Sequence, residues 1–275
     1  MNARAAAGLV TGLAAVMAVA STALARSELT VPQIIERNAS ARGGLEAWHK
    51  IQTMAWVGHV ESAKLPGKNI PFLLEQQRPN RTRFEIAAEN QKSIRAYDGR
   101  KGWKLRPGSN GTPELRAFTS DELSFARGAQ VIDGPLMEDV GQGGVVTLGG
   151  VDEVDGHRAY ALNVQLPSGT HHRVWVDTQS FLELKYEREF RDSQGQSAVT
   201  AVYYRNYHSF EGLMMPVVIE SSAAAAVDAN RMVIERVALN PPLDGQIFEA
   251  PRVVVPKHHG VTVDTRDSQS AEPFN

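Results

Sequence analysis

Apolar and polar residues alternate along most of this chain, and a period of two is typical of β-strands. In the segment MAWVGHVES, Met54, Trp56 and Val60 share one face, whereas His59 and Glu61 lie on the other. Turn residues separate further segments of this kind, at intervals too short for the crossover helices that parallel strands need. The pattern predicts antiparallel strands over Met54–Ser62, Ile70–Arg78, Thr82–Ala88, Lys92–Tyr97, Gly102–Arg106, Val145–Val154, His157–Leu166, His171–Asp177, Leu182–Arg191, Ala198–Tyr207, Met214–Ser221 and Met232–Leu239.

A helix is predicted before the first strand. Thr30 is of the residue type that caps helix N-termini, and Pro32 is favoured in a first turn. Gly43-Gly44 should end this helix, and Leu45 to Lys50 should resume it briefly.

A second helical segment interrupts the strands. Thr119 and Glu122 have the spacing of a capping box, and Phe118 and Leu123 have that of a hydrophobic staple. We expect two short amphipathic helices between residues 120 and 140, separated at Gly134-Pro135.

The segment HHRVWVDTQSFLELKYEREF is rich in titratable groups. One strand face is predicted to carry His171, Arg173, Trp175 and Asp177, and the other His172, Val174 and Val176. After a tight turn, a row of charges follows at every second position: Glu183, Lys185, Glu187 and Glu189. The paired carboxylates of a hydrolase would surround a cleft, whereas this row has the spacing of a solvated strand face. We therefore predict a hairpin with an exposed charged face.

The N-terminus has the features of a secretory signal peptide. Arg4 precedes a mostly apolar run that ends in Ala23-Leu24-Ala25, an A-x-A cleavage pattern. The run is mostly alanine, so it is a poor membrane span. We expect cleavage after Ala25 and a soluble protein in the periplasm.

Composition argues against several functions. Without residues 1–25, 28 Lys and Arg stand against 31 Asp and Glu, which gives no basic face for nucleic acid. Cysteine is absent, and so are the G-x-S-x-G and H-E-x-x-H motifs. Adjacent histidines on an extended chain point to opposite faces, so His171-His172 and His258-His259 are expected to be surface histidines. The sequence predicts no catalytic residues, no metal site and no cofactor, and therefore no enzyme.

Several stretches together resemble the LolA/LolB-like superfamily of periplasmic lipoprotein carriers. They are ARGGLEAWHKIQTMAWVGHV near the start, then VWVDTQSFLELKYE, DSQGQSAVTAVYYRNY, GLMMPVVIES and ALNPPLDGQIFEAP. The likeness runs from Val31 to Pro251. It implies a mainly β (α+β) fold, a half-open antiparallel β-barrel whose concave apolar face is covered by helices. This domain is expected over residues 26–255, followed by a polar, disordered tail over 256–275.

The resemblance implies a carrier that holds a lipid or a lipidated protein in that concavity without catalysis, in outer-membrane biogenesis. Its partners would be the lipid or acylated protein and an inner-membrane transporter or outer-membrane acceptor. The helices over 120–140 are expected to form a lid hinged at Gly134-Pro135. The expected cavity residues are Met54, Trp56, Val60, Phe72, Leu74, Phe84, Trp103, Leu123, Phe125, Ile132, Leu136, Met137, Tyr186 and Tyr203.

A second function remains open on the sequence. The same fold can serve as a sensor or protein-interaction module that regulates an envelope partner. Carrier and sensor do not differ in any residue pattern of this chain.

Overall fold

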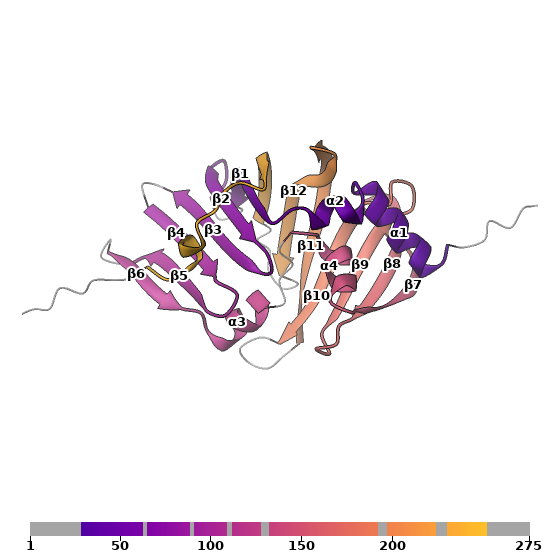
Figure 1. The fold of residues 1–275 in the computed structure, drawn as a ribbon, viewed down its shortest axis with the longest axis horizontal. Coiled ribbons are helices and arrows are strands. Elements are labelled where there is room, and N and C mark those ends of the chain that lie inside the picture. The colour runs from indigo at the N-terminus through magenta and orange to yellow at the C-terminus, as the bar shows by residue number, and fades with distance from the viewer. Residues whose placement is uncertain are drawn as a thin grey trace, which may run out of the picture.

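A single curved antiparallel sheet forms the body of the computed structural model (Figure 1). The structure describes residues 29–62, 65–88, 91–108, 112–127, 132–191, 197–223 and 230–251, so the predicted signal peptide and tail lie outside the described residues. The strands are β1 (Thr53–Ser62), β2 (Asn69–Gln77), β3 (Arg81–Ala88), β4 (Gln91–Tyr97), β5 (Gly102–Pro107), β6 (Pro113–Ala117), β7 (Val145–Val154), β8 (His157–Gln165), β9 (His171–Asp177), β10 (Glu183–Arg191), β11 (Ser197–Phe210), β12 (Leu213–Ala223) and β13 (Asn230–Leu239).

The 13 strands form two meanders that meet where β1 pairs with β13. Their order is β6-β5-β4-β3-β2-β1-β13-β12-β11-β10-β9-β8-β7, so β6 and β7 are the two free edges and the barrel is not closed. The predicted strands and the half-open barrel are confirmed. Strand β6 is an addition, because the short segment PELRA has no alternation that marks it as a strand.

The helices are α1 (Val31–Ala41), α2 (Leu45–His49), α3 (Ser120–Arg127), α4 (Pro135–Gly141) and the 3-10 turn η1 (Gly245–Phe248). The predicted start of α1 is confirmed: Thr30 and Gln33 form a capping box, and a proline stands in the first turn. Helices α1, α2 and α4 lie across the half that contains β8–β12 (Figure 1). We call the sheet face that they cover, which bears Met54, Leu74, Leu162 and Val174, the concave face.

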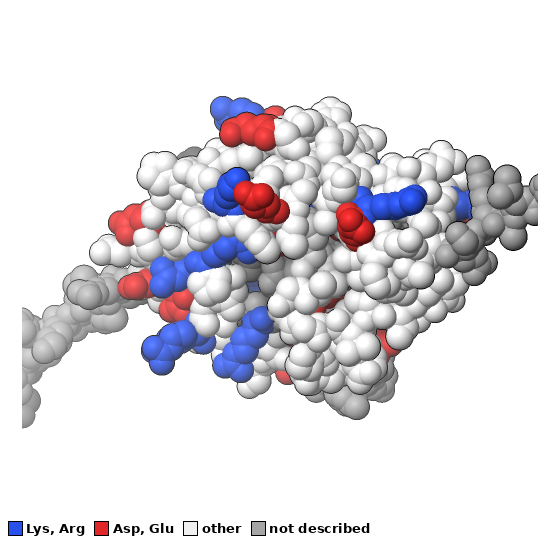
Figure 2. All heavy atoms as spheres, turned by 45° about the vertical axis from the view of Figure 1, so that its right-hand side comes forward, with Lys and Arg blue, Asp and Glu red and all other residues white. Residues whose placement is uncertain are grey.

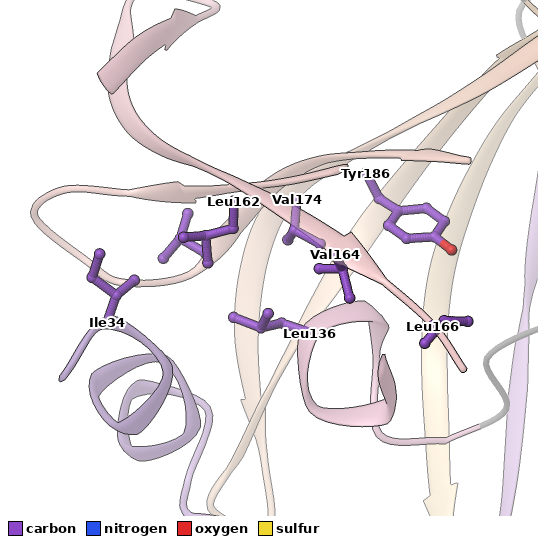
Figure 3. Close-up of a cluster of buried hydrophobic side chains, with 8 residues drawn as sticks. Ile34, Leu136, Leu162, Val164, Leu166, Val174 and Tyr186 are labelled. Atoms are coloured by element: carbon purple, nitrogen blue, oxygen red, sulfur yellow. The ribbon is translucent and has the colours of Figure 1, made fainter. Parts of the chain in front are cut away.

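Two clusters of buried side chains join the helices to the concave face. In Figure 3, Ile34 of α1 and Leu136 of α4 face Leu162, Val164 and Val174 of β8 and β9. The second cluster contains Trp48 of α2, Met54 of β1 and Met137 beside them, all at most 6% exposed. Because full burial of one such side chain contributes about 1.5–3 kcal/mol, these contacts hold α4 firmly inside the half-barrel.

The hairpin of β9 and β10 is confirmed, but one part of its charged row is wrong. The register shifts between Glu183 and Lys185, and this bulge turns the Glu183 side chain to the concave face. There Glu183 is fully buried and forms an ion pair with Arg42, at 3.2 Å between Oε1 and Nη1. The hydroxyl of Tyr207 also donates to the Glu183 backbone carbonyl, at 2.9 Å.

We expect Glu183→Ala to lower the free energy of unfolding by about 3–5 kcal/mol, because it leaves the Arg42 charge buried without its carboxylate. Urea denaturation of the purified protein measures this loss. The matched control is Glu189→Ala, on the exposed part of the same strand, where the expected change is within about 0.5 kcal/mol. Equal losses in the two variants would contradict the structural role of the buried pair.

Candidate ligand-binding site on the concave face

An open apolar surface lies on the concave face over β1, β2 and β3. Trp56 stands opposite Leu74, and Leu74 stands opposite Phe84, so the three side chains form one row across three strands. Phe72 and Ile86 form a second row beside it, and the rings of Phe72 and Phe84 lie 5.7 Å apart. We call this surface the apolar wall; it consists of Trp56, Val60, Phe72, Leu74, Phe84 and Ile86. All except Phe72 are only half-buried.

Another group of the predicted cavity residues is already covered by the protein itself. Met54, Ile132 and Met137 pack with Trp48 in one core cluster, and Leu136 and Tyr186 lie in the other. Each of the five is at most 6% exposed. The structure therefore divides the predicted set into an open wall and a filled core.

Two predicted residues lie on the opposite face of the sheet. Trp103 is opposite Ala96, whereas its neighbour Lys104 is opposite Arg95 and faces the concave side. The Trp103 indole donates to the Phe248 carbonyl at 2.8 Å and lines a groove of about 860 Å³ beside η1. Tyr203 is opposite Lys185 and packs against Trp175. Both were expected in the cavity because they are aromatic. Side chains alternate between the two faces along a strand, however, and the positions of Trp103 and Tyr203 put them on the face away from the cavity.

Helix α4 is fixed by charge as well as by apolar packing. The guanidinium of Arg78 binds both carboxylate oxygens of Asp133, just before α4, and the Asp133 carbonyl accepts from Arg42 at 2.6 Å. Toward the other end of α4, both carboxylate oxygens of Asp139 lie 2.9 Å from Nδ1 of His172. The predicted surface position of His172 is wrong, since both side chains of this pair are 1% exposed.

Gly134 lies directly before α4, which begins at the predicted Pro135, whereas α3 already ends at Arg127. The surroundings of Gly134 explain why glycine stands there. Its φ is +83°, and a Cβ at this position would meet Nη1 of Arg42 at 2.1 Å. Because glycine has no Cβ, the Arg42 guanidinium can pack against the backbone of Gly134 in the core. This close packing favours a fixed α4 over a hinge at Gly134-Pro135.

Helix α3 is held differently, by polar contacts. It spans the opening between β4–β5 and β10, which we call the mouth of the half-barrel. Glu122 accepts from Lys104 at 2.8 Å and from Arg95 at 3.1 Å. Farther along the helix, the Arg188 guanidinium of β10 lies 4.8 Å from the Phe125 ring centroid and donates to the Phe125 carbonyl. Helix α3 thus bridges β4 and β5 of one meander to β10 of the other.

The apolar side chains of α3 are less buried than predicted. Phe125 is 48% exposed, and Leu123 is half-buried. None of the side chains of α3 is buried. The helix therefore contributes little apolar burial, and its attachment depends on Glu122 and Arg188.

Glu122 has a strongly shifted titration. Burial by itself would raise its pKa, but hydrogen bonds from Lys104, from the Thr119 backbone and from Arg95 outweigh it and lower the pKa to about 2. The carboxylate is therefore ionised in the folded protein throughout the neutral range.

An open antiparallel half-barrel with a helix-covered concave face defines the class of this structure: it is a LolA-like fold. A LolA superfamily protein from Nitrosomonas europaea superposes with a TM-score of 0.53 at 14% identity, over 81% of this chain and 98% of the other. A domain from Vibrio parahaemolyticus, described as an outer membrane lipoprotein-sorting protein, gives 0.52 at 10% identity, over 78% and 94%. A DUF1329 family protein from Desulfovibrio piger gives 0.51 at 14% identity, over 80% and 97%.

Comparison of sequences adds no closer relative. No protein-family model matches the chain, and no curated protein matches it. The similarity to solved structures therefore establishes the fold. Among the described residues, no helix is long and apolar enough to cross a membrane, and no group of three or more His, Asp or Glu side chains lies together as metal ligands would.

We expect the stabilisation that Glu122 provides to be lost in acid. Its folded pKa is about 2, against an ordinary value of 4.5, so this contribution is complete above about pH 4.5 and disappears as the pH falls toward 2. The measurement is the difference in free energy of unfolding between the wild type and Glu122→Gln, followed from pH 7 to pH 2.

The control for this titration is Glu114→Gln, which removes an exposed carboxylate beside Arg116. Exposed ion pairs contribute about 0–1 kcal/mol, so the free energy of unfolding of Glu114→Gln should change with pH as that of the wild type does. If the difference in free energy of unfolding between the wild type and Glu122→Gln stays constant down to pH 2, the proposed attachment of α3 is contradicted.

Proposed function

We propose that this protein is a periplasmic carrier or binding protein for a hydrophobic ligand, a lipid or a lipidated protein, which it holds on the apolar wall. The observation that carries the proposal is the half-exposed row of Trp56, Leu74 and Phe84, on the inner surface of a barrel that is not closed. Apolar rows of this kind are normally covered, either by the protein itself or by a ligand.

The distribution of burial supports a ligand at this position. In the half that contains β8–β10, helices α1 and α4 cover the concave face and leave Leu162 and Val174 fully buried. Over β1–β3, by contrast, five wall residues are only half-buried. An acyl chain on these residues would supply the apolar contact that α1 and α4 provide elsewhere, at about 25 cal/mol per Å² of apolar surface removed from water.

The fold is consistent with this function. The Vibrio parahaemolyticus domain is described as a lipoprotein-sorting protein, and its likeness extends over most of both chains. The predicted signal peptide supports export to the compartment where such a carrier would act. We propose no catalytic step. A transporter or acceptor in the envelope membranes is the partner that a carrier requires.

Binding of palmitate, measured by calorimetry, tests the wall directly. We expect Leu74→Gln to weaken binding about tenfold, since it places an amide among the apolar contacts. Leu73→Gln is the matched control: it is the same change on the adjacent residue, which is also half-buried but faces the other side of the sheet. Equal affinities of the two variants for palmitate would exclude the wall as the binding surface.

A reversible crosslink tests whether α3 has to move. The chain has no cysteine, so a pair introduced by Phe125→Cys and Arg188→Cys can be joined by a reducible bis-maleimide linker, which replaces the length of the arginine side chain between α3 and β10, without competing thiols. We expect the crosslinked form to take up palmitate much more slowly than the same protein after reduction of the linker, because the helix can no longer leave the mouth. Native mass spectrometry measures loading in both forms. Equal loading of the two would show that α3 does not control access.

A further inference from the structure

The apolar wall continues into positive charge on the same sheet face. Phe84 is opposite Arg95, and Arg95 is opposite Lys104, so one row across the concave face runs Trp56, Leu74, Phe84, Arg95, Lys104. Directly opposite side chains of an antiparallel pair have Cβ atoms about 5 Å apart. The two cations therefore follow immediately after the last aromatic residue of the wall.

The two cations differ in exposure. The Lys104 side chain is 14% exposed, whereas the Arg95 side chain is 42% exposed and its guanidinium lies 4.9 Å from the ring centroid of Phe118. Figure 2 shows Lys and Arg side chains spread over the visible surface of the molecule, several of them beside Asp or Glu. Lys104 has lost most of its hydration and therefore requires an anion nearby, and Arg95 adds a second positive charge beside it.

The anion that meets this requirement in the structure comes from α3. Glu122 places both carboxylate oxygens 2.8 Å from Nζ of Lys104, and one of them 3.1 Å from Nη1 of Arg95. Among the described residues, no other acidic side chain forms an ion pair with either cation. The carboxylate belongs to the one described helix that has no buried side chain. It is thus an anion that can be exchanged at small structural cost.

We propose that Arg95 and Lys104 form the headgroup site of the carrier and bind the anionic group of an amphiphilic ligand, a carboxylate or a phosphate, whose acyl chain lies along the apolar wall. Glu122 occupies this site when the ligand is absent. The inference rests on the proposed function and adds the class of ligand: an acidic amphiphile, in preference to an uncharged lipid.

The dimensions of the row suit such a molecule. From β4 to β1 there are three interstrand spacings, or about 14 Å, over which an acyl chain would contact Phe84, Leu74 and Trp56 in turn. At the other end, the ligand anion would replace the Glu122 carboxylate, so the number of charges beside Arg95 and Lys104 would not change. Release of Glu122 removes one attachment of α3, and binding of an anionic head is thereby coupled to opening of the mouth.

Two pairs of probes test the headgroup site. Palmitate is compared with hexadecanol, and palmitoyl-lysophosphatidylglycerol with monopalmitoylglycerol; within each pair the acyl chain is the same and the negative charge differs. We expect the wild type to bind the anionic member about tenfold or more tightly, the value of one charge-assisted hydrogen bond. A preference in the first pair alone would identify a carboxylate site, and one in the second pair alone a phosphate site.

The double variant Arg95→Gln/Lys104→Gln should lose this preference and keep its affinity for hexadecanol. The matched control is Arg100→Gln/Lys101→Gln, which removes two exposed cations from the adjacent β4–β5 turn and should keep the preference. Glu122→Gln should bind palmitate about tenfold more tightly than the wild type, because the internal competitor is gone. Thermal unfolding of each variant shows whether the sheet is intact.

The outcomes separate this inference from the proposed function. If the wild type binds hexadecanol and palmitate equally well, the protein is a lipid carrier without a headgroup site, and the inference is overturned. If it binds neither, the proposed function itself fails. A preference that is lost equally in the Arg100/Lys101 control would show that the general field of the protein, rather than this site, selects anions.

Discussion

The pairing of β1 with β13 is the contact on which the rest of the structure depends. It joins a meander from the first half of the chain to one from the second half, with Met54 opposite Leu239 and Trp56 opposite Val237. Without it, the apolar wall and the helix-covered half would belong to separate sheets, and neither would face a concavity. The cost is a loss of chain entropy, because the contact joins residues far apart in sequence.

Within that sheet, polar contacts in the core distinguish the two inserted helices. Arg42, Arg78 and His172 hold the ends of α4 against the sheet, and removal of a buried polar partner is far more costly than removal of a surface charge. Helix α3 has only two polar attachments and little apolar burial. The two inserted helices therefore differ in role: α4 completes the core, and α3 covers the mouth.

Strand alternation was sufficient to predict the sheet, the hairpins and the inward phase of Trp56, Leu74 and Phe84, because period two is a local property of the chain. Helix caps gave the starts of α1 and α3 in the same way. The buried state of Glu183 was not predictable, since it depends on a one-residue bulge and on Arg42, which lies 141 positions away. The contact between His172 and Asp139 likewise needs the tertiary fold. Trp103 and Tyr203 were predicted in the cavity because they are aromatic, although their positions in the strand alternation put them on the opposite face of the sheet.

The short distance along the chain between α3 and α4 sets a limit on any opening of the mouth. Arg127 ends α3, and Ile132, five positions later, is already buried in the core beside α4. Five residues extend over at most about 18 Å, so the C-terminal end of α3 stays within that radius while α4 holds its place. Under the proposed function, α3 can move away from Lys104 only within this radius of the core. Return of Glu122 to Lys104 after release of a ligand would then take place within a small volume, at a high effective concentration of the carboxylate.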